Sequence, residues 1–478
     1  MNRSDMLVVV SAILAAGAGV VGYESAAAEN GRKVKTTLNY RYSYDGAKTE
    51  KANDIYWMYL DRPQGDGVSI LMESGAEFKT AYKGDSATIT REIVDVEDVV
   101  VPDTLGGKKV LRLGCDFYGE LFRCCVAVSS ISIPNGVTNF FDEGNSIAKH
   151  ATLKRIVVAK DHPTYSTRDG VLYDKSGKTL VCCPAGIEGS FVIPDGVEVV
   201  GDTAFDGCFR IRNLTIPPSL RKVPGGLVPW GVGLREVHIS DIAAWCGIEF
   251  DRTGLIMGDE AGSSNPLAQA HNLYLDGKLV TDVVIPDGVR SICDMAFIGC
   301  TSLRTVSLPD SVTNIGWRAF ADCVSLEKIK FGASVKSIGE CAFFNCVALH
   351  EVEIPDSVTS IGNPVGSFNI LKSGIFNGCV SLRRVVLPKT LREIPENAFL
   401  GCAELSEVVI PKGVECIGAG AFYGCKRLTE IEIPKGVKEI GATGEFALDI
   451  KGVFEGCGLQ EIEIPGSVKT IEIGRAHV

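Results

Sequence analysis

The chain has 478 residues, of which 45% are hydrophobic and 22% are charged, a composition that excludes a disordered protein. The formal net charge of −11 repels a nucleic-acid backbone, and the sequence shows no basic patch with interleaved aromatic residues. We therefore expect no nucleic-acid partner. The length allows about three ordinary domains, unless the chain is repetitive.

The first 28 residues have the pattern of a secretory signal peptide. Arg3 gives a basic start, residues 6–22 are almost wholly apolar or small, and residues 26–28 are three alanines that suit cleavage. A single membrane anchor is the alternative, but an apolar run of about 17 residues is at the short limit for a membrane span. The pattern predicts export with cleavage of residues 1–28. The mature protein would then have no membrane span and be secreted or located at the cell surface.

Residues 29–88 contain no repeat. They include alternating apolar runs, such as residues 68–72 and 87–90, which are typical of strands. We predict a small β-rich N-terminal cap, because a stack of repeats needs a cover for its first open edge.

Residues 89–471 repeat one phrase, I-P-x-x-V-x-x-I-G-x-x-A-F-x-x-C-x-x-L-x-x-V-x-I-P. The turn prolines Pro388, Pro411 and Pro434 are 23 residues apart. A unit of this size cannot bury its own apolar face, so the copies must stack. Counting the turn prolines gives about twelve coils. We predict an α/β repeat solenoid, a rod built mostly of short strands and turns.

Each copy contains three segments. Leu303, Val306 and Leu308 follow the period of two that is typical of a strand with one buried side. After a proline turn, Val312 and Ile315 form a second inward-facing segment. The Ala-Phe pair that follows predicts a short helical turn on the far side of the coil.

One phenylalanine and one cysteine recur in each coil, three residues apart. We interpret them as the structural core of the repeat, with the cysteines as a ladder of buried thiols. Seventeen cysteines in an exported protein favour disulfides instead, but parallel side chains on stacked coils give poor geometry for a bridge. The disulfide state of the other cysteines, such as Cys124 and Cys125, stays open. The core positions are Phe297, Cys300, Phe320, Cys323, Phe343, Cys346, Phe376, Cys379, Phe399, Cys402, Phe422 and Cys425.

Inserts interrupt the repeat near residues 162–185, 239–282, 363–372 and 442–450. The last two follow the same Ile-Gly pair of their coils, so we expect them to leave the rod on one side. Residues 472–478 fit no repeat. Their sequence is what a truncated reading frame running into a sequencing adapter would encode, and a short natural tail is the alternative.

The repeat phrase and two of its inserts resemble the BspA-like leucine-rich repeat family, the bacterial surface-antigen type. Residues 165–173 read Y-S-T-R-D-G-V-L-Y and are followed by P-A-G at 184–186, residues 244–250 read A-W-C-G-I-E-F, and residues 102–107 read P-D-T-L-G-G. The resemblance covers roughly residues 90–471. It implies a leucine-rich-repeat rod that serves as a secreted or surface-displayed binding module, often in adhesion, and it implies no particular ligand.

The sequence contains none of the common catalytic or metal-binding patterns. The six histidines include no pair at metalloprotease spacing, and there is no C-x-x-C, G-x-S-x-G or P-loop motif. The acidic residues fall at turn and strand positions, where no glycosidase pair can be assigned. We therefore predict that the protein is not an enzyme and has no cofactor and no metal site.

The outward positions of the first strand differ from coil to coil, whereas the inward positions repeat. Two interpretations stay open: a solvated face, or a docking stripe for a cationic or Ca²⁺-bridged partner. No aromatic row is visible on this face, which argues against a polysaccharide platform. The candidate binding residues are Lys328, Lys330, Glu351, Glu353, Arg384, Glu407, Glu430, Glu432, Glu461 and Glu463.

These patterns favour an exported leucine-rich repeat protein that acts as a binding or adhesion module at the cell surface. The expected partner is a protein or glycan on a neighbouring or host surface, bound through the strand face and the inserts. One alternative is a structural spacer within a larger, truncated surface protein. Another is the repeat region of an enzyme whose catalytic domain is missing from this chain.

Overall fold

The computed structural model describes residues 97–113, 128–138, 151–202, 204–224, 233–251, 264–362, 374–442 and 452–471, and the backbone of six strands between residues 35 and 92. The predicted signal peptide, the insert at 363–372, nearly all of the insert at 442–450, the tail at 472–478 and the pair Cys124 and Cys125 lie outside the described residues. The chain forms two compact units. One comprises residues 1–128 and 139–145, and the other comprises residues 129–138 and 146–478.

The N-terminal unit consists of β-strands in the described residues. In one sheet, β6 lies between β1 and β5 with antiparallel pairing, and in the other the order is β2-β3-β4-β9-β8. Strand β9 pairs in parallel with β4, so residues 108–113 join this unit although their sequence places them in the repeat. The strands are β1 (Lys35–Tyr40), β2 (Lys48–Ala52), β3 (Ile55–Asp61), β4 (Val68–Ser74), β5 (Lys79–Lys83), β6 (Ser86–Glu92), β7 (Asp98–Val100), β8 (Thr104–Leu105) and β9 (Lys108–Leu113).

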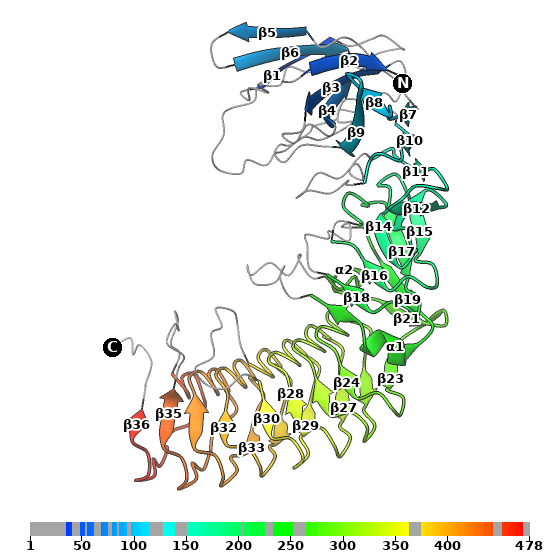
Figure 1. Ribbon diagram of the computed structural model, residues 1–478. Coiled ribbons are helices and arrows are strands. Elements are labelled where there is room, and N and C mark those ends of the chain that lie inside the picture. Colours follow the sequence, from blue (N-terminus) through cyan, green and yellow to red (C-terminus); the bar gives the residue numbers. More distant parts are fainter. Residues whose placement is uncertain are drawn as a thin grey trace, which may run out of the picture. The chain divides into compact units, whose positions relative to one another are not determined.

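The second unit is a β-solenoid, as predicted, and the described residues trace about twelve turns. Strands of successive coils pair in parallel and form two ladders along the solenoid, as Figure 1 shows for the yellow and orange coils. The N-terminal coils contain β10 (Ser130–Ile133), β11 (Arg155–Val158), β12 (Tyr165–Arg168) and β13 (Val171–Asp174).

The first ladder is formed by the L-x-x-V-x-I segments. Its pairs are in register at the repeat spacing, with Asp282 opposite Thr305 and Thr305 opposite Lys328. The strands are β15 (Gly189–Val192), β17 (Ile211–Thr215), β19 (Glu236–Ile239), β21 (Leu273–Leu275), β22 (Lys278–Leu279), β23 (Asp282–Val284), β25 (Thr305–Ser307), β27 (Lys328–Lys330), β29 (Glu351–Glu353), β31 (Arg384–Val386) and β33 (Glu407–Val409). Strand β22 pairs antiparallel with β21, and the other paired strands are parallel. The ladder consists of three sheets, because β22 is not paired with β23 and β27 is not paired with β29.

The second ladder is formed by the V-x-x-I segments that follow each proline turn. It extends further toward the C-terminus than the first ladder, because it includes β35 and β36. The strands are β14 (Thr179–Cys182), β16 (Val199–Val200), β18 (Lys222–Val223), β20 (Glu249–Phe250), β24 (Ser291–Ile292), β26 (Asn314–Ile315), β28 (Ser337–Ile338), β30 (Ser360–Ile361), β32 (Glu393–Ile394), β34 (Cys416–Gly418), β35 (Glu439–Ala442) and β36 (Thr470–Ile471).

The third side of each coil contains turns, and the short helical turn predicted there is not formed. Its residues include left-handed positions, such as Arg318 (φ 51°) and Asp322 (φ 59°), which a right-handed helix cannot contain. The N–H of Phe320 donates to the carbonyl of Ala342 in the next coil at 2.8 Å, rather than to a carbonyl one turn back. Within the described residues the only helices are α1 (Ile242–Cys246) and α2 (Leu267–Ala270), both in the insert at 239–282.

The phenylalanine of each coil stacks on that of the next and forms a spine through the core. The ring centroids of Phe297 and Phe320 are 5.2 Å apart, and those of Phe320 and Phe343 are 5.5 Å apart, with nearly parallel planes. The stack continues to Phe454. The centroid separation follows the spacing of the coils, which the parallel ladders fix at about 4.8 Å along the hydrogen-bond direction.

The cysteine of each coil is a buried hydrogen-bond donor. Cys323 Sγ donates to the carbonyl of Phe297 at 3.1 Å, and Cys402 Sγ donates to the carbonyl of Phe376 at 3.2 Å. Burial raises the pKa of the Cys300 thiol to about 11, so this thiol stays protonated at neutral pH. All described cysteines are free thiols.

Candidate binding surface

The exposed side of the first ladder, called the first face below, carries the residues predicted as a binding stripe. All ten side chains are exposed. Lys328 and Lys330 lie on β27, Glu351 and Glu353 on β29, Arg384 on β31, Glu407 on β33, and Glu430, Glu432, Glu461 and Glu463 on the two coils after β33.

The parallel register brings three of these residues into one row. Arg384 lies opposite Glu351 on one side and opposite Glu407 on the other. Its Nε is 3.5 Å from the Glu407 carboxylate, and the Arg384 side chain is 47% exposed. An exposed pair of this kind contributes at most about 1 kcal/mol. The row therefore arranges charge on the surface more than it stabilises the solenoid.

Other ion pairs also join adjacent coils at the repeat spacing. Arg304 pairs with Glu327 at 3.9 Å, and Arg427 pairs with Glu404 at 3.1 Å. These contacts relieve part of the repulsion among the acidic residues.

The first face also contains an aromatic pair that the sequence did not predict. The rings of His238 on β19 and Tyr274 on β21 stack with centroids 4.7 Å apart and planes at 15°, and His238 Nε2 lies 2.9 Å from a Glu236 carboxylate oxygen. Val237 is registered with Leu273, 36 residues later. The sequence pattern did not reveal this pair, because the two residues are separated by part of the insert at 239–282 and their 36-residue separation differs from the 23-residue repeat.

Beyond β33 the first ladder changes. The segment containing Glu430 and Glu432 is not a strand, although the second ladder continues through the same coils. Between this segment and β33 lies an open hollow of about 860 Å³, lined by Val408, Val409 and Ile431 among others. Two of the predicted binding residues, Glu430 and Glu432, therefore flank a concave part of the surface.

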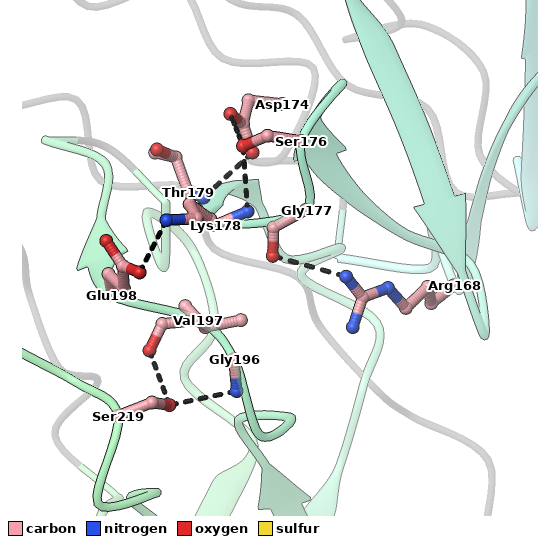
Figure 2. Close-up of polar contacts among 10 residues, drawn as sticks. All are labelled: Arg168, Asp174, Ser176, Gly177, Lys178, Thr179, Gly196, Val197, Glu198 and Ser219. Carbon is pink, nitrogen blue, oxygen red and sulfur yellow. Dashed lines mark hydrogen bonds and ion pairs between the residues drawn. The ribbon is translucent and has the colours of Figure 1, made fainter.

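The insert at 162–185 is an antiparallel meander of β12, β13 and β14, and side chains support the turn between β13 and β14, as Figure 2 shows. Asp174 accepts hydrogen bonds from the Ser176 hydroxyl at 2.5 Å and from the Thr179 N–H at 2.8 Å. Arg168 Nη2 donates to the carbonyl of Gly177 at 3.2 Å. These contacts fix the turn between β13 and β14.

Polar contacts then tie this insert and the following coils together (Figure 2). Lys178 Nζ is 2.8 Å from a Glu198 carboxylate oxygen. One coil later, the Ser219 hydroxyl accepts from the Gly196 N–H at 3.0 Å and donates to the Val197 carbonyl at 2.8 Å. Serine at this turn position therefore links two coils, so the insert and the repeat form one continuous structure.

The described residues contain no group of three or more His, Cys, Asp or Glu side chains that could hold a metal ion. Among the helices of that same part of the chain, none is long and apolar enough to span a membrane. The buried ladder cysteines, such as Cys323 with a strongly raised pKa, are poor nucleophiles.

Comparison with known proteins agrees with this architecture. The model of the BspA type leucine rich repeat region matches residues 187–228, 271–369 and 364–474 in six copies. The chain belongs to the BspA-type leucine-rich repeat family. The resemblance noted from the sequence is thus confirmed, and the matched repeats include every predicted stripe residue.

Several solved structures of leucine-rich repeat proteins are similar to the chain. A leucine rich cell surface protein from Faecalibacterium prausnitzii A2-165 is 20% identical, with 90% of this chain and 96% of that chain covered and a TM-score of 0.34. A leucine rich repeat protein of T. pallidum is 32% identical over 40% of this chain and 73% of that chain, with a TM-score of 0.28. The pneumococcal vaccine antigen PcpA is 16% identical, with 89% and 98% covered and a TM-score of 0.42. No curated protein matches the chain.

Proposed function

We propose that this chain is an exported, non-enzymatic binding module of the adhesion type, which recognises a protein or glycan on another cell surface through its first face. One observation carries the proposal. The inward residues of the first ladder are nearly uniform, as Val306 and Val352 illustrate at 2% exposure, whereas the outward residues differ from coil to coil. A solenoid of this kind offers an extended surface for recognition.

The predicted signal peptide at 1–28 supports export. The free cysteines are compatible with export, because ladder thiols such as Cys323 are buried and burial keeps them protonated. Oxidants attack the exposed thiolate form of cysteine. A buried thiol ladder is therefore compatible with an oxidising environment.

A pull-down with matched variants tests the proposal. The purified chain is incubated with labelled surface extracts of neighbouring or host cells, beside a variant with Glu353→Lys and Lys330→Glu on the first face. A control variant carries Glu439→Lys on the second ladder. We expect the first-face variant to lose the captured partner and the control to retain it. Equal capture by all three chains, or capture by none, would contradict a binding role of this face and would favour the spacer alternative.

A further inference from the structure

We propose that the hollow between β33 and the segment 430–432 binds an extended peptide segment that carries alternating basic and aliphatic side chains and adds as a strand to the edge of β33. The proposal rests on the proposed function, since it assigns a partner chemistry to one part of the first face.

The first observation is an interruption of the first ladder. At most earlier coils backbone bonds join neighbouring strands, for example from the Leu308 N–H to the Lys330 carbonyl at 2.8 Å and from the Ile354 N–H to the Val386 carbonyl at 3.0 Å. Strands β27 and β29 are also not paired with each other, but their inward residues Ile329 and Val352 stay buried. Within the described residues 407–436, no backbone hydrogen bond joins β33 to the segment 430–432. Strand β33 therefore presents one edge with backbone groups that lack a partner strand.

The interruption is local to the first face. The second ladder pairs Ile417 with Ile440 across the same two coils. On the third side the Phe422 and Phe454 rings stack at 5.6 Å, and the Phe422 N–H donates to the Val453 carbonyl at 3.0 Å. The two coils are thus held at normal spacing on two sides and open on one.

The opening exposes apolar surface. Val352 and Val385, at the inward position of β29 and β31, are 2% exposed, whereas Val408 and Ile431 at the equivalent positions are only partly buried. The outward Val409 is 78% exposed. An exposed apolar strand edge is a template for strand addition, in which backbone bonds supply affinity and alternate side chains supply specificity.

The charge around the hollow selects the partner. Glu430 and Glu432 line it and form no ion pair within the described residues, whereas nearby Glu407 is already paired with Arg384. Lys412 and Lys435 also line the hollow. The two lysines lie in the proline turns, whereas Glu430 and Glu432 flank Ile431 in the segment opposite β33. These carboxylates beside exposed valine favour a segment in which Lys or Arg alternates with Val, Ile or Leu.

A peptide-binding assay on the full chain tests this proposal. The probe is a capped, fluorescent heptapeptide of alternating Lys and Val, compared with the same peptide N-methylated at alternate residues, with a Glu-Val peptide and with a Lys-only peptide. We expect the Lys-Val peptide to bind and each of the three comparison peptides to bind at least about tenfold more weakly. Equal binding of the N-methylated peptide would overturn strand addition. Equal binding of the Lys-only peptide would overturn the role of the valine surface.

Variants of the chain locate the site. Glu430→Lys with Glu432→Lys should weaken the affinity for the Lys-Val peptide by at least about tenfold, whereas Glu439→Lys on the second ladder should leave that affinity within about twofold. Hydrogen exchange should show new protection at Val408–Ile410 when the peptide is bound. Protection elsewhere, a requirement for Ca²⁺, or self-association that competes with the peptide would each overturn the assignment.

The peptide assay and the surface pull-down together separate this inference from the proposed function. If the Lys-Val peptide does not bind but surface capture still depends on the first face, only this inference is wrong. If the chain also captures no surface partner, the proposed function is wrong as well.

Discussion

The thiol of Cys346 donates to the backbone carbonyl of Phe320 at 3.2 Å, one coil earlier in the solenoid. The same contact recurs at most ladder cysteines, so the cysteine of one coil satisfies a carbonyl beside the phenylalanine spine of the preceding coil. This explains why the repeat uses a small side chain with a weak donor at this position, rather than a purely apolar one.

Replacing Cys346 separates packing from hydrogen bonding. Cys346→Val keeps most of the volume but leaves the Phe320 carbonyl without its donor, which costs about 1–3 kcal/mol for a buried group. Cys346→Ser keeps a donor and should lose less stability. Urea midpoints of the two variants, compared with the parent chain, check this order. A smaller loss for valine than for serine would show that the thiol contributes only by filling space.

Thiol reactivity should differ along the ladder. Burial raises the pKa of Cys323 strongly, whereas the Cys457 side chain at the C-terminal end of the ladder is only partly buried. A partly exposed thiol can meet the reagent and ionise more easily, so iodoacetamide should label Cys457 well before Cys323 under native conditions. Peptide mapping after timed labelling measures the order. Early labelling of Cys323, or disulfides between ladder cysteines, would contradict the buried-thiol arrangement.

Two glycines should differ in their tolerance of alanine. Gly424 has φ +72°, but an added Cβ would lie 3.7 Å from the nearest atom, so Gly424→Ala incurs only the left-handed strain of about 1–2 kcal/mol. An added Cβ at Gly339 would meet the Gly316 backbone at 2.6 Å, which forces adjacent coils apart. We expect Gly339→Ala to lower the thermal midpoint more than Gly424→Ala. The reverse order would argue against close approach of the coils at Gly316.

The insert at 162–185 should loosen in acid because of His162. Its Nδ1 accepts from the Tyr165 N–H at 3.1 Å, which leaves the Nε2 proton to donate to the Val137 carbonyl at 3.1 Å. Burial lowers the pKa of His162 from its ordinary value of 6.5. The unfolded chain then takes up a proton at a higher pH than the folded one, so this contribution is complete above about pH 6.5 and is lost as the pH falls toward the folded value.

Hydrogen exchange at the Tyr165 amide between pH 7.5 and pH 5, corrected for intrinsic exchange rates, checks this prediction. The parent chain should lose protection in acid. In His162→Asn the side-chain oxygen takes the place of the Nδ1 acceptor without a titrating group, so its protection should not change with pH. The same acid loss in both chains would assign the effect to another group.

The sequence predicted the coils well because proline turns and inward residues repeat at one spacing. It could not predict the opening beside β33, since Glu351-Val352-Glu353 forms β29 whereas the equivalent Glu430-Ile431-Glu432 forms no strand. The local pattern is the same in both, so the difference arises from how neighbouring coils pack. The prediction of a helical turn was wrong for a related reason: backbone bonds to the next coil alternate with local turn bonds, so no helix forms.

The aromatic pair on the first face shows a second limit of the sequence. His238 and Tyr274 are 36 residues apart, and only the parallel pairing of β19 with β21 brings them together. A repeat spacing predicts contacts between regular coils and gives no register across an insert.

Site-specific photo-crosslinking on intact cells tests whether the first face contacts a partner. A photo-crosslinking amino acid is placed at Glu353 on the first face in one chain and at Ser360 on the second ladder in another, and each chain is irradiated on partner cells. Recognition through the first face predicts a discrete crosslinked partner from position 353 and none from position 360. Crosslinks from position 360 alone, or none from either position on cells that retain the protein, would contradict recognition through the first face.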